Sequence, residues 1–139
     1  MTVGLLIVSH DQFGGALLRT ADRMFGDIPL QTRALAVTID ASPETLLEEA
    51  HAKVQEINSG DGVLVLTDMY GSTPSNIAFG LMQPGEVNVV SGVNLPMLIR
   101  TLNYPNLDLA ALTEKAISGG REGIFCCTQS EQTAPHAEP

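Results

Sequence analysis

The sequence is poor in aromatic residues and in positive charge. Of its 139 residues only 4% are aromatic and none is tryptophan, so a buried core has to be built from aliphatic side chains. Lysine and arginine together number 7 and aspartate and glutamate 16, which gives a formal net charge of -9. A chain of this charge lacks the basic surface by which proteins bind nucleic acid or anionic membranes.

Long hydrophobic runs and separated cysteines are also missing. No apolar run approaches the roughly 20 residues of a membrane span, and the first residues lack the basic segment of a signal peptide. The two cysteines, Cys126 and Cys127, are adjacent. Neighbours on a strand point to opposite faces, so an ordinary disulfide between them is not expected. We therefore expect a cytoplasmic protein in a reducing environment, without membrane insertion.

Short apolar runs alternate with amphipathic segments along the chain. Residues 3–8 and 63–67 are almost wholly apolar and predict strands buried on both faces. Two weaker runs, 32–37 and 87–90, predict further strands. The expected helices cover residues 12–25, 42–58, 73–82 and 95–102, with one more that Asp108 caps and that Gly119 and Gly120 end.

This alternation predicts a doubly wound α/β three-layer sandwich around a mostly parallel sheet of four strands. A last strand, from Ile124 to Thr128, follows a glycine-rich turn and is expected to lie antiparallel at the edge of the sheet. Residues 1–128 then form a single domain. Residues 129–139 are polar, contain two prolines and have no periodicity, which predicts a disordered tail.

Polar residues follow two strands that we expect at the centre of the sheet. Ser9, His10 and Asp11 come after the first strand, and a loop from Asp68 to Thr73 comes after the third. The carboxyl ends of parallel strands meet at one edge, where open α/β sheets bind their ligands. If these strands are neighbours, His10 and Asp68 face each other.

A histidine beside a carboxylate is suited to nucleophilic chemistry. The carboxylate holds the proton on one imidazole nitrogen and leaves the other nitrogen free to attack. Helix starts near Gln12, Pro74 and Leu95 favour anions at the same edge, and the hydroxyls of Ser72 and Thr73 lie near them in the sequence. This combination predicts phosphoryl transfer through a phosphohistidine on His10.

Each of these residues also has a simpler interpretation. Asp11 is suited to cap the first helix, Asp68 to bond the turn backbone, and His10 to lie on the surface. Gly14 and Gly15 are poor helix formers in a first turn, which indicates that some other group closely approaches the backbone there. There is no dinucleotide-binding or P-loop glycine pattern, and the three histidines are too scattered to predict a metal site. No cofactor is expected.

Three ordered motifs give the chain a family resemblance. They are Val8-Ser9-His10, the segment from Leu66 to Asn76 that reads LTDMYGSTPSN, and the segment from Val90 to Leu98 that reads VSGVNLPML. Together they resemble the IIA domain of the mannose-type sugar phosphotransferase system, from Val3 to about Thr128. Ser72 stands where many members of that family have a second glycine.

The resemblance implies a specific phosphotransferase. His10 would accept a phosphoryl group from the phosphocarrier protein HPr and pass it to a IIB component or a regulatory target. Asp68 would pair with His10, with Thr73 beside it. The resemblance also implies a homodimer that exchanges the strand from Ile124 to Thr128. Two alternatives stay open, namely the phosphotransferase subunit of dihydroxyacetone kinase and a non-catalytic signalling or anion-binding module.

Overall fold

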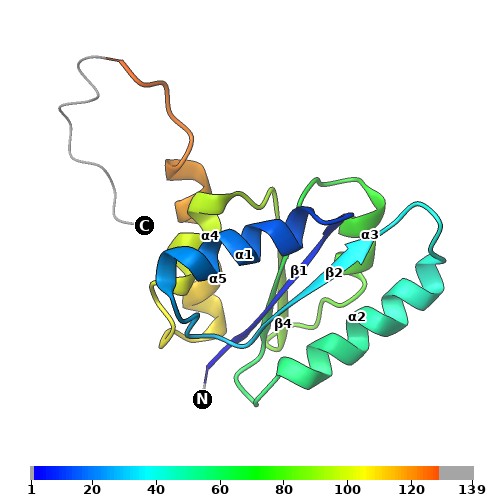
Figure 1. The fold of residues 1–139 in the computed structure, drawn as a ribbon. Helices are drawn as coiled ribbons and strands as arrows, with labels where there is room; N and C mark the ends of the chain where they lie inside the picture. The colour runs from blue at the N-terminus through cyan, green and yellow to red at the C-terminus, as the bar shows by residue number, and fades with distance from the viewer. Residues whose placement is uncertain (1, 129–139) are drawn as a thin grey trace.

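Four parallel strands form one sheet in the computed structural model, which describes residues 2–128 (Figure 1). They are β1 (Gly4–His10), β2 (Thr32–Val37), β3 (Val63–Thr67) and β4 (Val87–Ser91), in the order β2-β1-β3-β4. Val8 of β1 lies opposite Leu35 of β2 on one side and Thr67 of β3 on the other. The predicted parallel sheet of four strands is confirmed.

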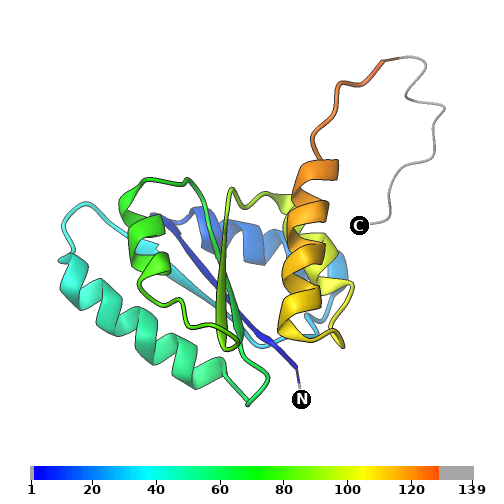
Figure 2. The ribbon, with the colours of Figure 1, turned by 180° about the vertical axis from the view of Figure 1, so that it is seen from behind.

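Five helices cover the two faces of the sheet. They are α1 (Phe13–Phe25), α2 (Pro43–Ile57), α3 (Thr73–Phe79), α4 (Leu95–Leu102) and α5 (Leu109–Glu122). Helices α1, α4 and α5 pack on one face, and α2 and α3 on the other, as the two opposite views show (Figures 1 and 2). The result is the expected three-layer sandwich.

The apolar run near the amino terminus is the central strand β1. Leu5 and Ile7 point into the cluster beneath α1, α4 and α5, whereas Leu6 and Val8 point into the cluster beneath α2 and α3. All four side chains are fully buried. A strand between two helical layers needs apolar residues on both faces, which explains why the run does not alternate.

The strand order creates a switch point between β1 and β3. From β1 the chain crosses to β2 on one side through α1, and then returns past β1 to β3 through α2. The connections therefore leave the carboxyl ends of β1 and β3 in opposite directions. Ligands of doubly wound sheets bind in the crevice at this point.

Asp11, Gly119 and Gly120 do not have the roles at helix ends that the sequence predicts for them. Asp11 does not cap α1: the N-cap is Gln12, without a side-chain cap, and Asp11 adopts a left-handed conformation with φ 42° that turns the chain out of β1. Gly119 and Gly120 do not end α5, which continues to Glu122. A Cβ on Gly119 would lie 2.5 Å from Cβ of Arg100 in α4, so this glycine permits close packing of two helices.

The expected carboxyl-terminal strand is also absent from the part of the chain that the structure describes. Residues 124–128 follow α5 without regular structure and lead away from the sheet (Figures 1 and 2). Ile124 and Phe125 are 75% and 53% exposed. The segment therefore adds no strand to the sheet of its own chain. The predicted tail, residues 129–139, lies outside the described residues.

No helix within residues 2–128 is long and apolar enough to cross a membrane.

Candidate functional site

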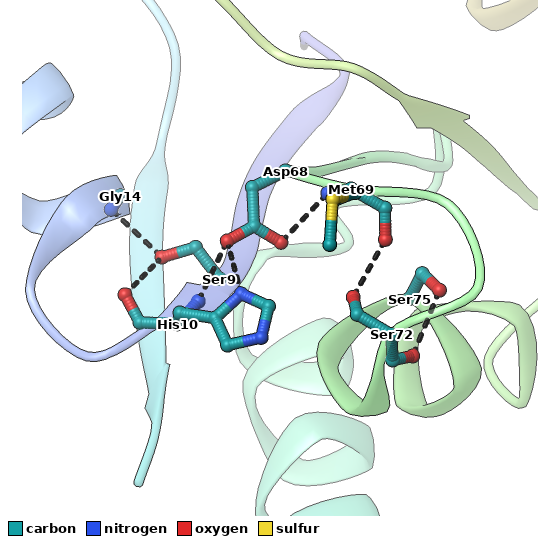
Figure 3. A network of polar contacts seen from close by, with 7 residues as sticks. All are labelled: Ser9, His10, Gly14, Asp68, Met69, Ser72 and Ser75. Atoms are coloured by element: carbon teal, nitrogen blue, oxygen red, sulfur yellow. Dashed lines mark hydrogen bonds and ion pairs between the residues drawn. The ribbon is translucent and has the colours of Figure 1, made fainter.

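His10 is the last residue of β1 and stands at the switch point. Its backbone N–H donates to Oδ2 of Asp68 at 2.8 Å, and its ring Nδ1 lies 2.7 Å from the same oxygen (Figure 3). The side chain of His10 is 52% exposed, whereas that of Asp68 is 14% exposed. The structure thus brings together the two residues that the sequence predicts to face each other.

The contact decides which nitrogen of the ring is available. An ionised carboxylate only accepts hydrogen bonds, so Nδ1 carries the proton in the neutral imidazole. The other nitrogen, Nε2, keeps its lone pair and points away from Asp68 (Figure 3). Because His10 is half exposed, Nε2 is accessible to a reactant from outside.

Asp68 is the first residue after β3, and its carboxylate has donors on both oxygens. Oδ1 accepts from the backbone N–H of Met69 at 2.9 Å, while Oδ2 accepts both bonds from His10. Burial raises the pKa of this carboxyl, but the hydrogen bonds from His10 and Met69 lower it by more, so the pKa of Asp68 lies below its ordinary value. The carboxylate is therefore ionised at neutral pH.

Ser72 and Thr73 lie at the start of α3. Ser72, not Thr73, is the N-cap of α3, and Thr73 is the first helical residue. The Ser72 hydroxyl does not cap the helix. It donates to the Met69 carbonyl at 2.6 Å and so closes the loop that carries Asp68 (Figure 3). Its carbonyl accepts from the hydroxyl of the buried Ser75 at 2.9 Å.

Ser9 explains the glycine at the start of α1. Its buried hydroxyl accepts from the backbone N–H of Gly14 at 2.7 Å, and a Cβ on Gly14 would lie 2.9 Å from that oxygen and 2.7 Å from Cγ2 of Ile7. The predicted close backbone approach is therefore confirmed for Gly14. The contact joins the first turn of α1 to the strand residue that precedes His10.

Two backbone donors at the site were missed by the sequence analysis. The N–H groups of Gly92 and Val93 donate to the carbonyls of Asp68 and Thr67, both at 3.0 Å. The signal for them was a glycine directly after β4, in the segment that carries the third family motif. Only the pairing of β3 with β4 shows that this loop meets the Asp68 loop.

Exposed apolar side chains lie in or next to the loops around His10. Phe13, Met69 and Tyr70 follow the ends of β1 and β3, and Ile39 follows the end of the neighbouring strand β2. The ring of Tyr70 makes an edge contact with Phe79 of α3. An apolar rim around a polar centre is typical of a surface that meets another protein.

The described residues around His10 do not form a set of metal ligands. Within residues 2–128 no group of three or more histidine, cysteine, aspartate or glutamate side chains could hold a metal ion. The chemical resources of the site are one nucleophilic nitrogen, one ionised carboxylate, and backbone and hydroxyl groups of the adjoining loops.

Several known proteins are similar in sequence to this chain. The family model EIIA-man, described as PTS system fructose IIA component, matches residues 4–117. The mannose-specific EIIAB component of Escherichia coli K12 is 33% identical over 133 residues, which cover 89% of this chain and 39% of that protein. The fructose-specific EIIA component of Bacillus subtilis is 29% identical and is covered over 88% of its length by 91% of this chain. The chain thus spans only about two fifths of the EIIAB relative.

Solved structures share the fold. The mannose/sorbose specific IIA subunit from Enterococcus faecalis superposes with a TM-score of 0.81 over 99% of this chain and 100% of that one, at 23% identity. The phosphotransferase component EIIA from Streptococcus agalactiae superposes with a TM-score of 0.75, at 25% identity, over 89% of this chain and 96% of that one. The family match includes β1, β3 and the loops after them, which together form the site. The chain therefore belongs to the EIIA-man family, the mannose-type IIA components of the sugar phosphotransferase system.

Proposed function

We propose that this chain is a cytoplasmic phosphoryl carrier, which accepts a phosphoryl group on Nε2 of His10 from an HPr-like phosphocarrier protein and passes it to a IIB component. The observation that carries the proposal is the 2.7 Å contact between Nδ1 of His10 and Oδ2 of Asp68. It leaves Nε2 as an accessible, unprotonated nucleophile. Membership of the family supplies the reaction class.

The transfer requires no cofactor. The Nε2 lone pair forms a bond to phosphorus while the bond from phosphorus to the phosphocarrier protein breaks, and the electron pair of the broken bond returns to the phosphocarrier. Positive charge that develops on the His10 ring is stabilised by Asp68, which accepts from Nδ1. Passing the group to a IIB component reverses these steps at His10, so the chain emerges unchanged.

We assign the binding of the phosphoryl oxygens to Ser72 and Thr73. Both lie at the start of α3, in the loop that Asp68 opens. Phosphoryl oxygens only accept hydrogen bonds, and the Ser72 hydroxyl already donates to Met69. Thr73 is therefore the main donor in this assignment, and Ser72 serves only after releasing the Met69 carbonyl.

The apolar rim supports a protein as the reaction partner. Phe13, Met69, Tyr70 and Ile39 are exposed on the edge that carries His10. A small phosphorylated metabolite would be enclosed by a pocket, whereas His10 is half exposed. A carrier protein can cover the rim and exclude water during transfer.

A homodimer completes the proposal. β4 is an edge strand of the sheet in this chain, and a cavity of about 360 Å³ between β4 and α5 is lined in part by Val89, Ile117 and Ile124. We assign residues 124–128 of a second copy to this edge. Sedimentation velocity of the full chain and of a chain ending at residue 123 tests this: loss of the dimer on truncation is expected, and a monomeric full chain would refute it.

Labelling experiments test the carrier function. Incubation with phosphoenolpyruvate, enzyme I and HPr should yield one acid-labile, base-stable phosphate per chain. His10→Ala should abolish the label without unfolding the protein, because the His10 side chain is half exposed. His51→Ala, which changes another exposed histidine in α2, is the matched control and should label as the parent does.

A regulatory module is the second candidate. The transcriptional regulatory protein LevR of Bacillus subtilis is 25% identical over 154 residues, which cover 98% of this chain but 16% of that protein. In this role His10 would be labelled, but the phosphate would not reach a IIB component. An unlabelled His10 with every HPr tested would instead favour a non-catalytic anion-binding module, and labelling by a dihydroxyacetone kinase system alone would favour its phosphotransferase subunit.

A further inference from the structure

The loop between β4 and α4 holds the main chain of Asp68. The N–H of Gly92 donates to the Asp68 carbonyl and the N–H of Val93 to the Thr67 carbonyl, both at 3.0 Å. These bonds extend the contact of the two chain segments beyond Thr67 and Ser91, the last paired residues of β3 and β4. Asp68 is thus held through its backbone by one loop and through its carboxylate by His10 and Met69.

The reach of the carboxylate depends on this backbone contact. One oxygen, Oδ2, meets both the backbone nitrogen and Nδ1 of His10, at 2.8 and 2.7 Å. The Asp68 side chain is short, so a shift of its Cα moves the carboxylate by a similar amount. Hydrogen bonds weaken steeply when distance and angle depart from these values. The Gly92 contact is therefore placed to control the contact between Asp68 and His10.

Gly92 adopts a conformation that favours glycine. Its φ is 85°, in the left-handed region, and a Cβ added there would have no atom within 4 Å. An alanine at this position would strain the backbone without creating a clash. The substitution consequently tests the conformation of the loop alone.

Asn94 anchors the other end of the loop. Its Oδ1 accepts from the backbone N–H of Met97 at 2.9 Å and caps α4, while its Nδ2 donates to the carbonyl of Gly120 in α5 at 3.2 Å. The same side chain therefore fixes the loop to two helices. Between this anchor and β4 the loop has only Gly92 and Val93.

We infer that Gly92 and Asn94 are positioning residues for phosphoryl transfer, which act by holding the Asp68 backbone so that its carboxylate meets His10. Neither residue needs to touch the phosphoryl group. For the transfer step the inference rests on the proposed function. The contact between His10 and Asp68 can be measured without any transfer.

The first test compares Gly92→Ala with Gly85→Ala. Gly85 has a φ of 80° and also has no atom within 4 Å of an added Cβ, but it lies in the turn before β4, at the opposite end of that strand from Gly92. The two substitutions carry the same backbone strain. We expect Gly92→Ala to lower kcat for phosphorylation by HPr about ten- to a hundredfold, with little change in KM, and Gly85→Ala to leave both unchanged.

The second pair guards against loss of folding at Gly92. Asn94→Ala removes the side-chain cap of α4. Asp108→Ala removes the side-chain cap of α5, in which Oδ1 of Asp108 accepts from the Ala111 N–H at 2.9 Å. Each variant loses one equivalent cap, but only Asn94 holds the loop. A lower kcat is expected for Asn94→Ala alone.

Nuclear magnetic resonance supplies a readout that does not depend on transfer. The amide proton of His10 should follow the ionisation of Asp68, because its acceptor Oδ2 loses charge on protonation. In Gly92→Ala this pH-dependent shift should fall by about half or more, and in Gly85→Ala it should be retained. Equal shifts and equal kcat values in the two variants would overturn the inference. A parent protein that HPr does not label would refute the carrier function, and the amide shifts would then decide the positioning role by themselves.

Discussion

One carboxylate oxygen of Asp68 accepts two hydrogen bonds from His10, at 2.8 Å from the backbone N–H and at 2.7 Å from the ring Nδ1. The backbone bond places the carboxylate relative to the chain of β1, and the ring bond then sets the side-chain orientation. A single residue directly after β3 thus holds both the position and the tautomer of the histidine.

Removal of the charge on Asp68 should slow phosphoryl transfer strongly. In Asp68→Asn the amide oxygen can still accept from the His10 backbone, but the charge that stabilises the imidazolium is lost. An amide is also able to donate to Nδ1, which would select the wrong tautomer. We expect a fall of about 10²- to 10⁴-fold in the rate of His10 labelling. Rapid-quench measurements with phosphorylated HPr check this, and a variant as fast as the parent would contradict the assigned role.

The same carboxylate should make stability depend on pH in the acid range. The pKa of Asp68 is lower in the folded chain than its ordinary value, because bonds from His10 and Met69 outweigh the effect of burial. The corresponding stabilisation is complete above the unfolded pKa of about 3.9 and is lost as the pH falls through the lower folded value. Urea unfolding of the parent and of Asp68→Asn between pH 7 and pH 2.5 measures the difference. The stability difference between the two should shrink below about pH 4, and a constant difference would contradict the lowered pKa.

Asp11 should be a source of backbone strain next to His10. It is the only non-glycine residue with positive φ between residues 2 and 128, and its N–H donates to the Val37 carbonyl at 3.1 Å. Asp11→Gly keeps that bond and removes the strain, so we expect a gain of up to about 1 kcal/mol in the free energy of unfolding. Asp11→Asn, which changes the charge but not the strain, is the control. If both variants gain equally, charge and not backbone conformation is responsible.

The hydroxyl of Thr67 should contribute nothing to stability. Thr67, which directly precedes Asp68 in the sequence, is fully buried. Its Oγ1 has no hydrogen-bond partner within residues 2–128. Thr101 is equally buried, but its Oγ1 donates to the Met97 carbonyl at 2.9 Å. Thr67→Val should therefore be neutral or stabilising, whereas Thr101→Val should cost about 1 kcal/mol. Equal losses in chemical denaturation would show that Thr67 has a bonding partner in solution.

The site could be predicted from the sequence as far as local pattern determines position. Each half of the pair follows an apolar run that had to be a buried strand, so His10 and Asp68 had to lie at the carboxyl edge of a parallel sheet. That they meet required β1 and β3 to be neighbours, which the sequence analysis held only as a condition and the strand order fulfils. Gly92 was not assigned a role, because its contact with Asp68 depends on the register of β3 and β4, to which residue type gives no local signal.

The errors have one physical origin. Asp11 is a good capping residue by type, and Gly119 and Gly120 are good helix terminators by type, but tertiary contacts overrode both propensities. The turn out of β1 needed a left-handed residue at Asp11, and the packing of α5 against α4 needed residues without side chains. The apolar residues Ile124 and Phe125 indicated a buried strand, but they are exposed and belong to no strand of their own sheet.

Hydrophobic periodicity alone determined the class of fold and the order of its elements, because a strand between two helical layers and a helix on one layer require different apolar patterns. The family motifs could likewise be recognised in one dimension. Tertiary structure decided which atoms touch. It set the two hydrogen bonds from His10 to one oxygen of Asp68, and it placed the loop that holds the Asp68 backbone. These contacts join residues separated by tens of positions, and their geometry follows from strand register and helix packing, which act over the whole chain at once.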